Sequence, residues 1–186
     1  MILYFRCVDA LREIDAVRPT PSVRDRWTGG SSESGLYTSD AEVGALAEFV
    51  KHREMDGINP FDILSTGQRE IVRVGNAEVN VTDFLDALDP TVMATVGITD
   101  PLGYTIDYDA TITVAQAFLS PRAAWDIVLK NGKTGLTGPS AAYRGANTFL
   151  IRASEVARLV GDFTTSLLEI PARLENDPNR VKGIPL

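Results

Sequence analysis

The spacing of apolar side chains predicts an amphipathic helix in the first third of the chain. Four of them recur at i, i+3, i+4 and i+7 and therefore share one helix face: Val43, Leu46, Ala47 and Val50. Ser39 stands three residues before Glu42, the pairing of a capping box, so we expect Ser39 to be the N-cap of this helix. Glu48 points away from the apolar face, among small side chains that would let another element or a ligand approach closely.

Residues rich in β-forming side chains predict strands on either side of this helix. Residues 2–8 are typical of a strand, and we expect their polar interruption, Arg6, to point outward from an edge strand. Residues 69–74 and 77–82 are also rich in β-formers, and the Gly75-Asn76 pair between them predicts a hairpin.

The second half of the chain mixes short helices with strands. We expect a short helix near residues 84–88, and helices over 113–119 and 123–130 with Pro121 in the first turn of the latter and Asn131-Gly132 at its end. Strands are expected at 147–152 and after Val160.

Length and composition indicate one folded domain. The chain has 186 residues, of which 44% are hydrophobic and 23% charged, values typical of a soluble globular protein. No apolar run approaches the roughly 20 residues of a membrane helix, and the first residues lack the pattern of a signal peptide. We therefore expect a cytoplasmic protein without a membrane partner.

The net charge of −7 is unevenly distributed. Residues 54–109 carry two Lys or Arg against eleven Asp or Glu, whereas residues 110–186 carry nine against six. The acidic middle argues against direct nucleic-acid binding, because contacts to phosphates need a basic surface. It fits a solvated face or a docking surface for a basic partner.

Residue types exclude several common active sites. Cys7 is the single cysteine, and no Cys/His cluster could hold zinc, so no metal site is expected. The single histidine, His52, lies at the end of the predicted helix, and no G-x-S-x-G motif accompanies it, which argues against a Ser-His-Asp hydrolase. Neither a P-loop nor a G-x-G-x-x-G after a strand is present.

The remaining candidates are several arginines, Tyr37, Glu48 and a Gly-Pro-Ser turn ending at Ser140. A guanidinium fork matches the oxygens of a diphosphate. A carboxylate suits a reaction that develops positive charge on a sugar, and an aromatic ring suits stacking on a planar base. Together these residue types indicate a nucleotide-sugar substrate such as NAD.

The order of these motifs resembles the RES domain, a family named for its arginine, glutamate and serine. R-W precedes a Gly-containing loop, L-Y-T-S follows, A-L-A-E lies on the predicted helix, and G-x-x-G-P-S-A comes late in the chain. The positions that match the family are Arg26, Tyr37, Glu48 and Ser140, together with Arg6 of the Phe5-Arg6 pair, which matches a Tyr-Arg pair in the first strand of the family. The resemblance spans about residues 4–152.

The resemblance implies an α+β fold similar to that of ADP-ribosyltransferases: a mixed, twisted β core with surrounding helices. It implies a single domain over residues 1–186, with the core at about 2–158 and a C-terminal extension after it. It also implies a toxin of a bacterial toxin–antitoxin pair that cleaves the nicotinamide–ribose bond of NAD, by hydrolysis or with inorganic phosphate as co-substrate. NAD is then the substrate and no other cofactor is needed. The expected protein partner is an Xre-type helix-turn-helix antitoxin.

Roles for individual residues follow from the same resemblance. Arg6 and Arg26 would contact the diphosphate or ribose, and Tyr37 would stack near nicotinamide. Glu48 would stabilise the developing oxocarbenium ion, and Ser140 would hydrogen-bond ribose or the carboxamide. Arg18 and Arg24, in the loop expected over residues 9–34, would add to a basic mouth.

The chain also departs from the family pattern. The usual Gly-Gly-Arg-Trp-Asn is Arg24-Asp25-Arg26-Trp27-Thr28 here, and Phe5 replaces the first-strand tyrosine. Two alternatives therefore stay open beside NAD degradation: an ADP-ribosyltransferase that modifies a macromolecule, and an inactive relative that only binds NAD or a partner.

Overall fold

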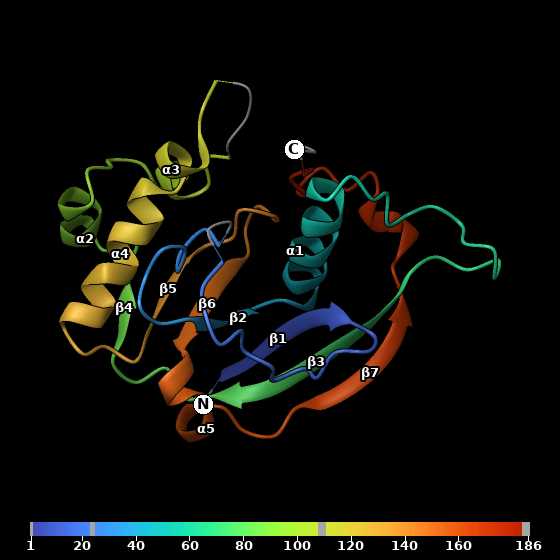
Figure 1. Ribbon diagram of the computed structural model, residues 1–186, viewed down its shortest axis with the longest axis horizontal. Helices are drawn as coiled ribbons and strands as arrows, with labels where there is room; N and C mark the ends of the chain where they lie inside the picture. The colour runs from blue at the N-terminus through green and yellow to red at the C-terminus, as the bar shows by residue number, and fades with distance from the viewer. Residues whose placement is uncertain (1, 23–24, 108–110, 184–186) are drawn as a thin grey trace.

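A seven-stranded twisted sheet organises the molecule (Figure 1). The computed structural model describes residues 2–22, 25–107 and 111–183. The strands are β1 (Ile2–Asp9), β2 (Gly35–Ser39), β3 (Ile71–Val79), β4 (Phe84–Asp86), β5 (Gly135–Pro139), β6 (Asn147–Arg152) and β7 (Thr164–Glu169). Their order is β4-β5-β6-β2-β1-β3-β7, with β4 and β5 parallel and the other pairs antiparallel. The expected mixed sheet of an α+β fold is confirmed.

Helices cover the sheet in two groups. The α-helices are α1 (Glu42–Met55), α2 (Pro90–Thr95), α3 (Val114–Ala117), α4 (Leu119–Lys130) and α5 (Val156–Leu159), and short 3-10 helices are η1 (Pro101–Tyr104), η2 (Ala153–Glu155) and η3 (Ala172–Leu174). In Figure 1, α1 stands over β1 and β3, whereas α2, α3 and α4 gather near β4 and β5. None of the helices in the described ranges is long and apolar enough to cross a membrane.

Each group of helices buries its own part of the core. Leu46 and Val50 of α1 pack on Val72 and Val74 of β3, so the apolar face read from the sequence is the face that is buried. Near the other end of the sheet, Trp125 and Val128 of α4 pack against Leu136, Leu150 and Trp27. The helix α4 ends as expected: Asn131 is its C-cap, and Gly132 follows with a φ of +62°.

The expected capping box at Ser39 is wrong. Ser39 is the last residue of β2, where it is buried and pairs with Thr148 of β6. The N-cap of α1 is Ala41, which is extended and makes no side-chain cap bond. The strand ladder to β6 holds the backbone of Ser39, and α1 packs close to its side chain: a Cβ at Gly44 would lie 2.3 Å from the Ser39 hydroxyl oxygen. Gly44 therefore lets the helix press against the strand end, and its small size serves this contact.

The expected hairpin at Gly75-Asn76 is also wrong, because both residues lie within the continuous strand β3. Gly75 and Asn76 pair with β1 on one side and with β7 on the other. A Cβ on Gly75 would lie 2.8 Å from the Ile14 side chain, so the glycine provides a close approach within a strand. The dipeptide that favours a turn here serves tertiary packing.

Two further local expectations are corrected. Residues 84–86 form the short strand β4, parallel to β5, where a helix was expected. The Phe84 ring lies 2.8 Å from the place a Cβ of Gly135 would take. Arg6 is not on an edge strand, since β1 lies between β2 and β3. The strand expected after Val160 is present as β7, which forms the sheet edge beside β3.

Candidate functional site

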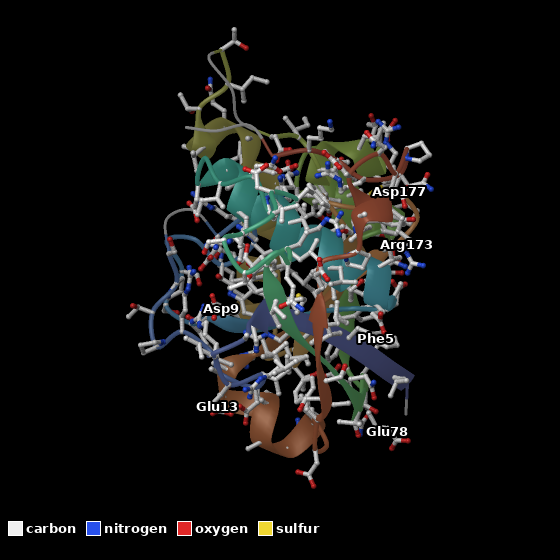
Figure 2. All side chains as sticks on the ribbon, turned by 90° about the vertical axis from the view of Figure 1, so that its right-hand side faces the viewer. Phe5, Asp9, Glu13, Glu78, Arg173 and Asp177 are labelled. Carbon is white, nitrogen blue, oxygen red and sulfur yellow. The ribbon has the colours of Figure 1, made fainter. Side chains whose placement is uncertain are left out.

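A cavity of about 800 Å³ lies where β1 and β2 separate. The register of β1 on β3 runs from Ile2 to Asp9, whereas its register on β2 consists of the single pair Phe5–Ser39. Beyond that pair the two strands diverge, and residues 5–9 of β1 line the cavity together with parts of β2, α1 and the loop after β1. Figure 2 labels Phe5 and Asp9, the two ends of this lining stretch of β1. The volume is in the range of small-molecule sites.

Four of the five residues expected in the site line this cavity: Arg6, Arg26, Tyr37 and Glu48. The fifth, Ser140, is buried behind it and contacts Glu48. The structure thus brings together residues from β1, the following loop, β2, α1 and the segment after β5.

Ser140 orients the carboxylate of Glu48. Its hydroxyl donates a hydrogen bond to Glu48 Oε1 at 3.0 Å. The Ser140 hydroxyl oxygen itself accepts hydrogen bonds from the amides of Ala142 and Tyr143, both at 3.2 Å. Both lone pairs of the hydroxyl are therefore used, and its proton is left for the carboxylate. We name residues 140–146 the serine turn; it is closed by a bond from the Ser140 amide to the Ala146 carbonyl.

Arg6 presents a partly satisfied guanidinium to the cavity. Nη2 donates to the Ala16 carbonyl at 2.8 Å, while buried Nη1 has no hydrogen-bond partner among the described residues. Burial, reinforced by the charge of Arg12, lowers the pKa of Arg6 to about 10. A buried cation with a free donor is suited to receive an anionic group.

Tyr37 is fixed from behind by the loop that carries the R-W motif. The Tyr37 hydroxyl accepts from the Trp27 amide at 3.3 Å, and burial raises its pKa above the ordinary range. Trp27 is 2% exposed and packs against Tyr104, with ring centroids 5.3 Å apart. A Cβ on Gly138 would lie 2.7 Å from the Trp27 ring, which explains the glycine there. The tryptophan therefore anchors the loop, and Arg26 beside it reaches the cavity wall.

Arg26 is already engaged within the protein. Nη1 donates to the carbonyls of Tyr104 at 3.2 Å and Ile106 at 2.6 Å, and Nη2 forms an ion pair with Asp107. Its guanidinium also lies 4.5 Å from the centroid of the Phe118 ring. The acidic middle of the chain thus supplies a carboxylate to the cavity.

Two functional candidates, Lys51 and Asp107, were missed from the sequence. Lys51 Nζ lies 2.6 Å from Asp107 Oδ2 and donates to the Ala141 carbonyl at 2.7 Å. Burial lowers the pKa of Lys51, opposed by the charge of Asp107. The position of Lys51 three residues after Glu48 on a helix could have indicated a shared face, but Asp107 lay in a segment without a readable pattern.

The expected basic mouth is only partly described. Arg18 lines the cavity and its exposed guanidinium lies 3.4 Å from Asp25. Arg24 lies outside the described residues. No group of three or more His, Cys, Asp or Glu within the described ranges is arranged to hold a metal ion.

The segment after η3 braces this site from behind. We name residues 177–183 the C-terminal strap. Arg180 Nη1 donates to Glu54 Oε1 of α1 at 2.7 Å, and the Val181 amide donates to the Ala142 carbonyl of the serine turn at 2.8 Å. The strap therefore links the helix that carries Glu48 to the turn that carries its serine partner.

Two further hydrogen bonds, one between side chains and one between backbone groups, reinforce this link. The Tyr143 hydroxyl donates to Asp177 Oδ2 at 3.1 Å, and the Arg144 amide donates to the Asn179 carbonyl at 2.8 Å. In Figure 2, Asp177 lies in the upper part of the view, at the level of α1, whereas Glu13 and Glu78 lie in the lower part.

Comparison with known proteins identifies a neighbour in structure. No family model matches the chain, and no curated protein matches it in sequence. Among solved structures, the chain is similar to a chain of the M. tuberculosis MbcT–MbcA toxin–antitoxin complex. The TM-score is 0.60 and the sequence identity 17%, over 90% of this chain and 83% of that chain. At this identity the likeness shows a shared fold.

Proposed function

We propose that this chain is a toxin of a bacterial toxin–antitoxin pair that degrades NAD by cleaving its nicotinamide–ribose bond. The observation that carries the proposal is the Glu48 carboxylate, held by the Ser140 hydroxyl at 3.0 Å, in a cavity that also presents Arg6 and Tyr37. The fold shared with a chain of a toxin–antitoxin complex and the resemblance to the RES domain support it.

The proposed reaction uses the carboxylate for electrostatic stabilisation. The C–N bond between ribose and nicotinamide breaks, its electron pair leaves with nicotinamide, and positive charge develops on the ribose ring. An oriented Glu48 stabilises that charge where it appears. Water or inorganic phosphate then adds to the anomeric carbon, giving ADP-ribose or its phosphate ester, with loss of a proton from the attacking group.

Other residues of the cavity would position the substrate. Arg6 is suited to an oxygen of the diphosphate or ribose, because its Nη1 donor is buried and unused among the described residues. The Tyr37 ring would stack near nicotinamide, its hydroxyl being held by the Trp27 amide. The Ser140 hydroxyl donates its proton in a hydrogen bond to Glu48, so in this proposal Ser140 orients the carboxylate. To contact ribose or the carboxamide instead, the hydroxyl would have to give up its hydrogen bond to Glu48.

Incubation of the purified protein with NAD, with and without phosphate, tests the proposal. We expect free nicotinamide in both cases or only with phosphate, and the second product identifies the acceptor. ADP-ribose attached to an added bacterial lysate protein would instead indicate an ADP-ribosyltransferase. Binding of NAD without nicotinamide release at high protein concentration would indicate an inactive relative and overturn the proposal.

An Xre-type helix-turn-helix antitoxin is the proposed partner, acting in the cytoplasm. The structural neighbour is part of a complex between a toxin and an antitoxin, which supports this pairing. Expression of this chain alone should arrest bacterial growth, and co-expression of an adjacently encoded helix-turn-helix protein should relieve the arrest through a complex that binds NAD poorly. A harmless chain, or equal NAD binding with the partner present, would contradict it.

A further inference from the structure

Two buried cations share one carboxylate on the cavity wall. The side chains of Lys51 and Arg26 are 5% and 11% exposed, and both pair with Asp107, which is 22% exposed. All three residues line the cavity described above. Because the two cations hold opposite oxygens of one carboxylate, the space between them already has the charge and shape of an oxyanion site.

Each cation also has an anchor that does not involve Asp107. Lys51 donates to the Ala141 carbonyl at 2.7 Å. Arg26 donates to the Tyr104 and Ile106 carbonyls and contacts the Phe118 ring. If the carboxylate of Asp107 left, both cations would therefore remain aimed at the same place.

Asp107 is the member of this group that can leave most readily. It is the most exposed of the three, so its carboxylate regains hydration when the side chain rotates outward. The cost of that rotation is the loss of both ion pairs, and an incoming anion that pairs with the same two cations offsets it. The backbone before Asp107 would stay in place, because Arg26 also donates to the carbonyls of Tyr104 and Ile106.

We propose that Arg26 and Lys51 form a subsite for a phosphate or pyrophosphate group, and that Asp107 fills this subsite from within the chain until a ligand displaces it. Assignment of that group to the diphosphate of NAD, or to the phosphate co-substrate, rests on the function proposed above. The existence of the subsite does not depend on that proposed function.

A self-filled subsite lowers the apparent affinity for the ligand. Only molecules in which Asp107 has moved away are competent to bind, so the measured Kd is the intrinsic Kd divided by their fraction. If the carboxylate occupies the subsite in about nine of ten molecules, its removal tightens binding about tenfold. Neutralising Asp107 should thus improve binding, whereas removal of an ordinary ligand-contacting residue would weaken it.

The test is titration of inorganic pyrophosphate and of inorganic phosphate into the full chain and into Asp107→Asn by calorimetry. We expect about tenfold tighter binding of at least one anion to Asp107→Asn. Lys51→Met in the same background should abolish the gain. Asp83→Asn, which breaks an exposed ion pair with Lys133, is the matched control and should leave both affinities unchanged.

Competition with NAD distinguishes the two sources of the group. Pyrophosphate that displaces NAD from Asp107→Asn places the diphosphate of NAD in the subsite, whereas phosphate that binds tighter without displacing NAD identifies the subsite of the co-substrate. Unchanged or weaker anion binding to a folded Asp107→Asn would overturn the proposal. If that variant does not fold, Asp107→Ser is measured, and failure of both to fold would make Asp107 a structural clamp and equally overturn it.

These outcomes are separate from those of the proposed reaction. Anion binding is measured without any turnover, so tighter binding to Asp107→Asn in a chain that never releases nicotinamide would retain the subsite and refute NAD cleavage. Nicotinamide release together with unchanged anion binding would retain NAD cleavage and refute the subsite.

Discussion

The hydrogen bond between Ser140 and Glu48 allows the proposed role of the carboxylate to be tested quantitatively. Glu48→Gln keeps the shape of the side chain and an oxygen that can still accept from Ser140, so the fold should persist. Loss of the charge removes an electrostatic contact to the transition state, which typically lowers kcat ~10²-fold or more. The expected result is a folded protein with little nicotinamide release.

Ser140→Ala measures how much of that effect depends on orientation. A hydrogen bond to a charged group contributes ~1.5–3 kcal/mol. If all of it served to orient Glu48, removal would slow the reaction ~10- to 150-fold, since 1.36 kcal/mol corresponds to tenfold in rate. This is an upper bound, because the Ala142 and Tyr143 amides also lose their acceptor and part of the cost falls on stability.

Combining the two substitutions separates a common role from independent ones. If Ser140 acts only through the carboxylate, as proposed, the double variant should be little slower than Glu48→Gln alone. Initial rates of nicotinamide release, followed by chromatography at saturating NAD, give the cycle. Glu78→Gln, at an exposed position of β3, controls for loss of an acidic side chain. Near-wild-type turnover of Glu48→Gln would refute the reasoning, and fully additive losses would assign Ser140 a role of its own.

Three further changes test other parts of the structure. Arg26→Lys loses the two-pronged contacts of the guanidinium, so the KM for NAD should rise several-fold and Tm should fall by a few degrees; unaltered kinetics would remove Arg26 from the site. Gly44→Ala would place a Cβ 2.3 Å from the Ser39 hydroxyl, and urea unfolding should show a loss of about 1–3 kcal/mol. Burial raises the pKa of Tyr4 to about 12. The buried, protonated tyrosine therefore contributes its full stability below pH 10, and this stability is lost as pH rises through 12. Tyr4→Phe should reduce that loss, which comparison of the urea midpoints at about pH 7 and 11 would show.

Local patterns predicted the elements whose sequence preference agrees with their place in the fold. The apolar spacing in α1 correctly predicted which face of the helix is buried, since Leu46 and Val50 on that face pack against β3. The strand expected at 147–152 is β6 for the same reason: Leu150 and Ile151 are buried within the sheet. The motif residues Tyr37 and Glu48 could be placed together because their order along the chain resembles a known family.

Elsewhere tertiary contacts overrode local preference. Gly75-Asn76 reads as a turn in isolation, but the side chain of Ile14 needs the space that a glycine leaves in β3. No pattern joins Lys51 to Asp107, which are 56 residues apart, and their contact exists only because the sheet brings α1 and the segment after η1 to one cavity. A sequence pattern carries no information on such a pairing.

The C-terminal strap has a consequence for the timing of synthesis. Synthesis runs from the N-terminus, so α1 and the serine turn are made before residues 177–183. Until those residues emerge, the bonds from Arg180 to Glu54 and from Val181 to Ala142 do not exist. The hydrogen bonds that support α1 and the serine turn from this side can therefore form only after residues 177–183 have been made.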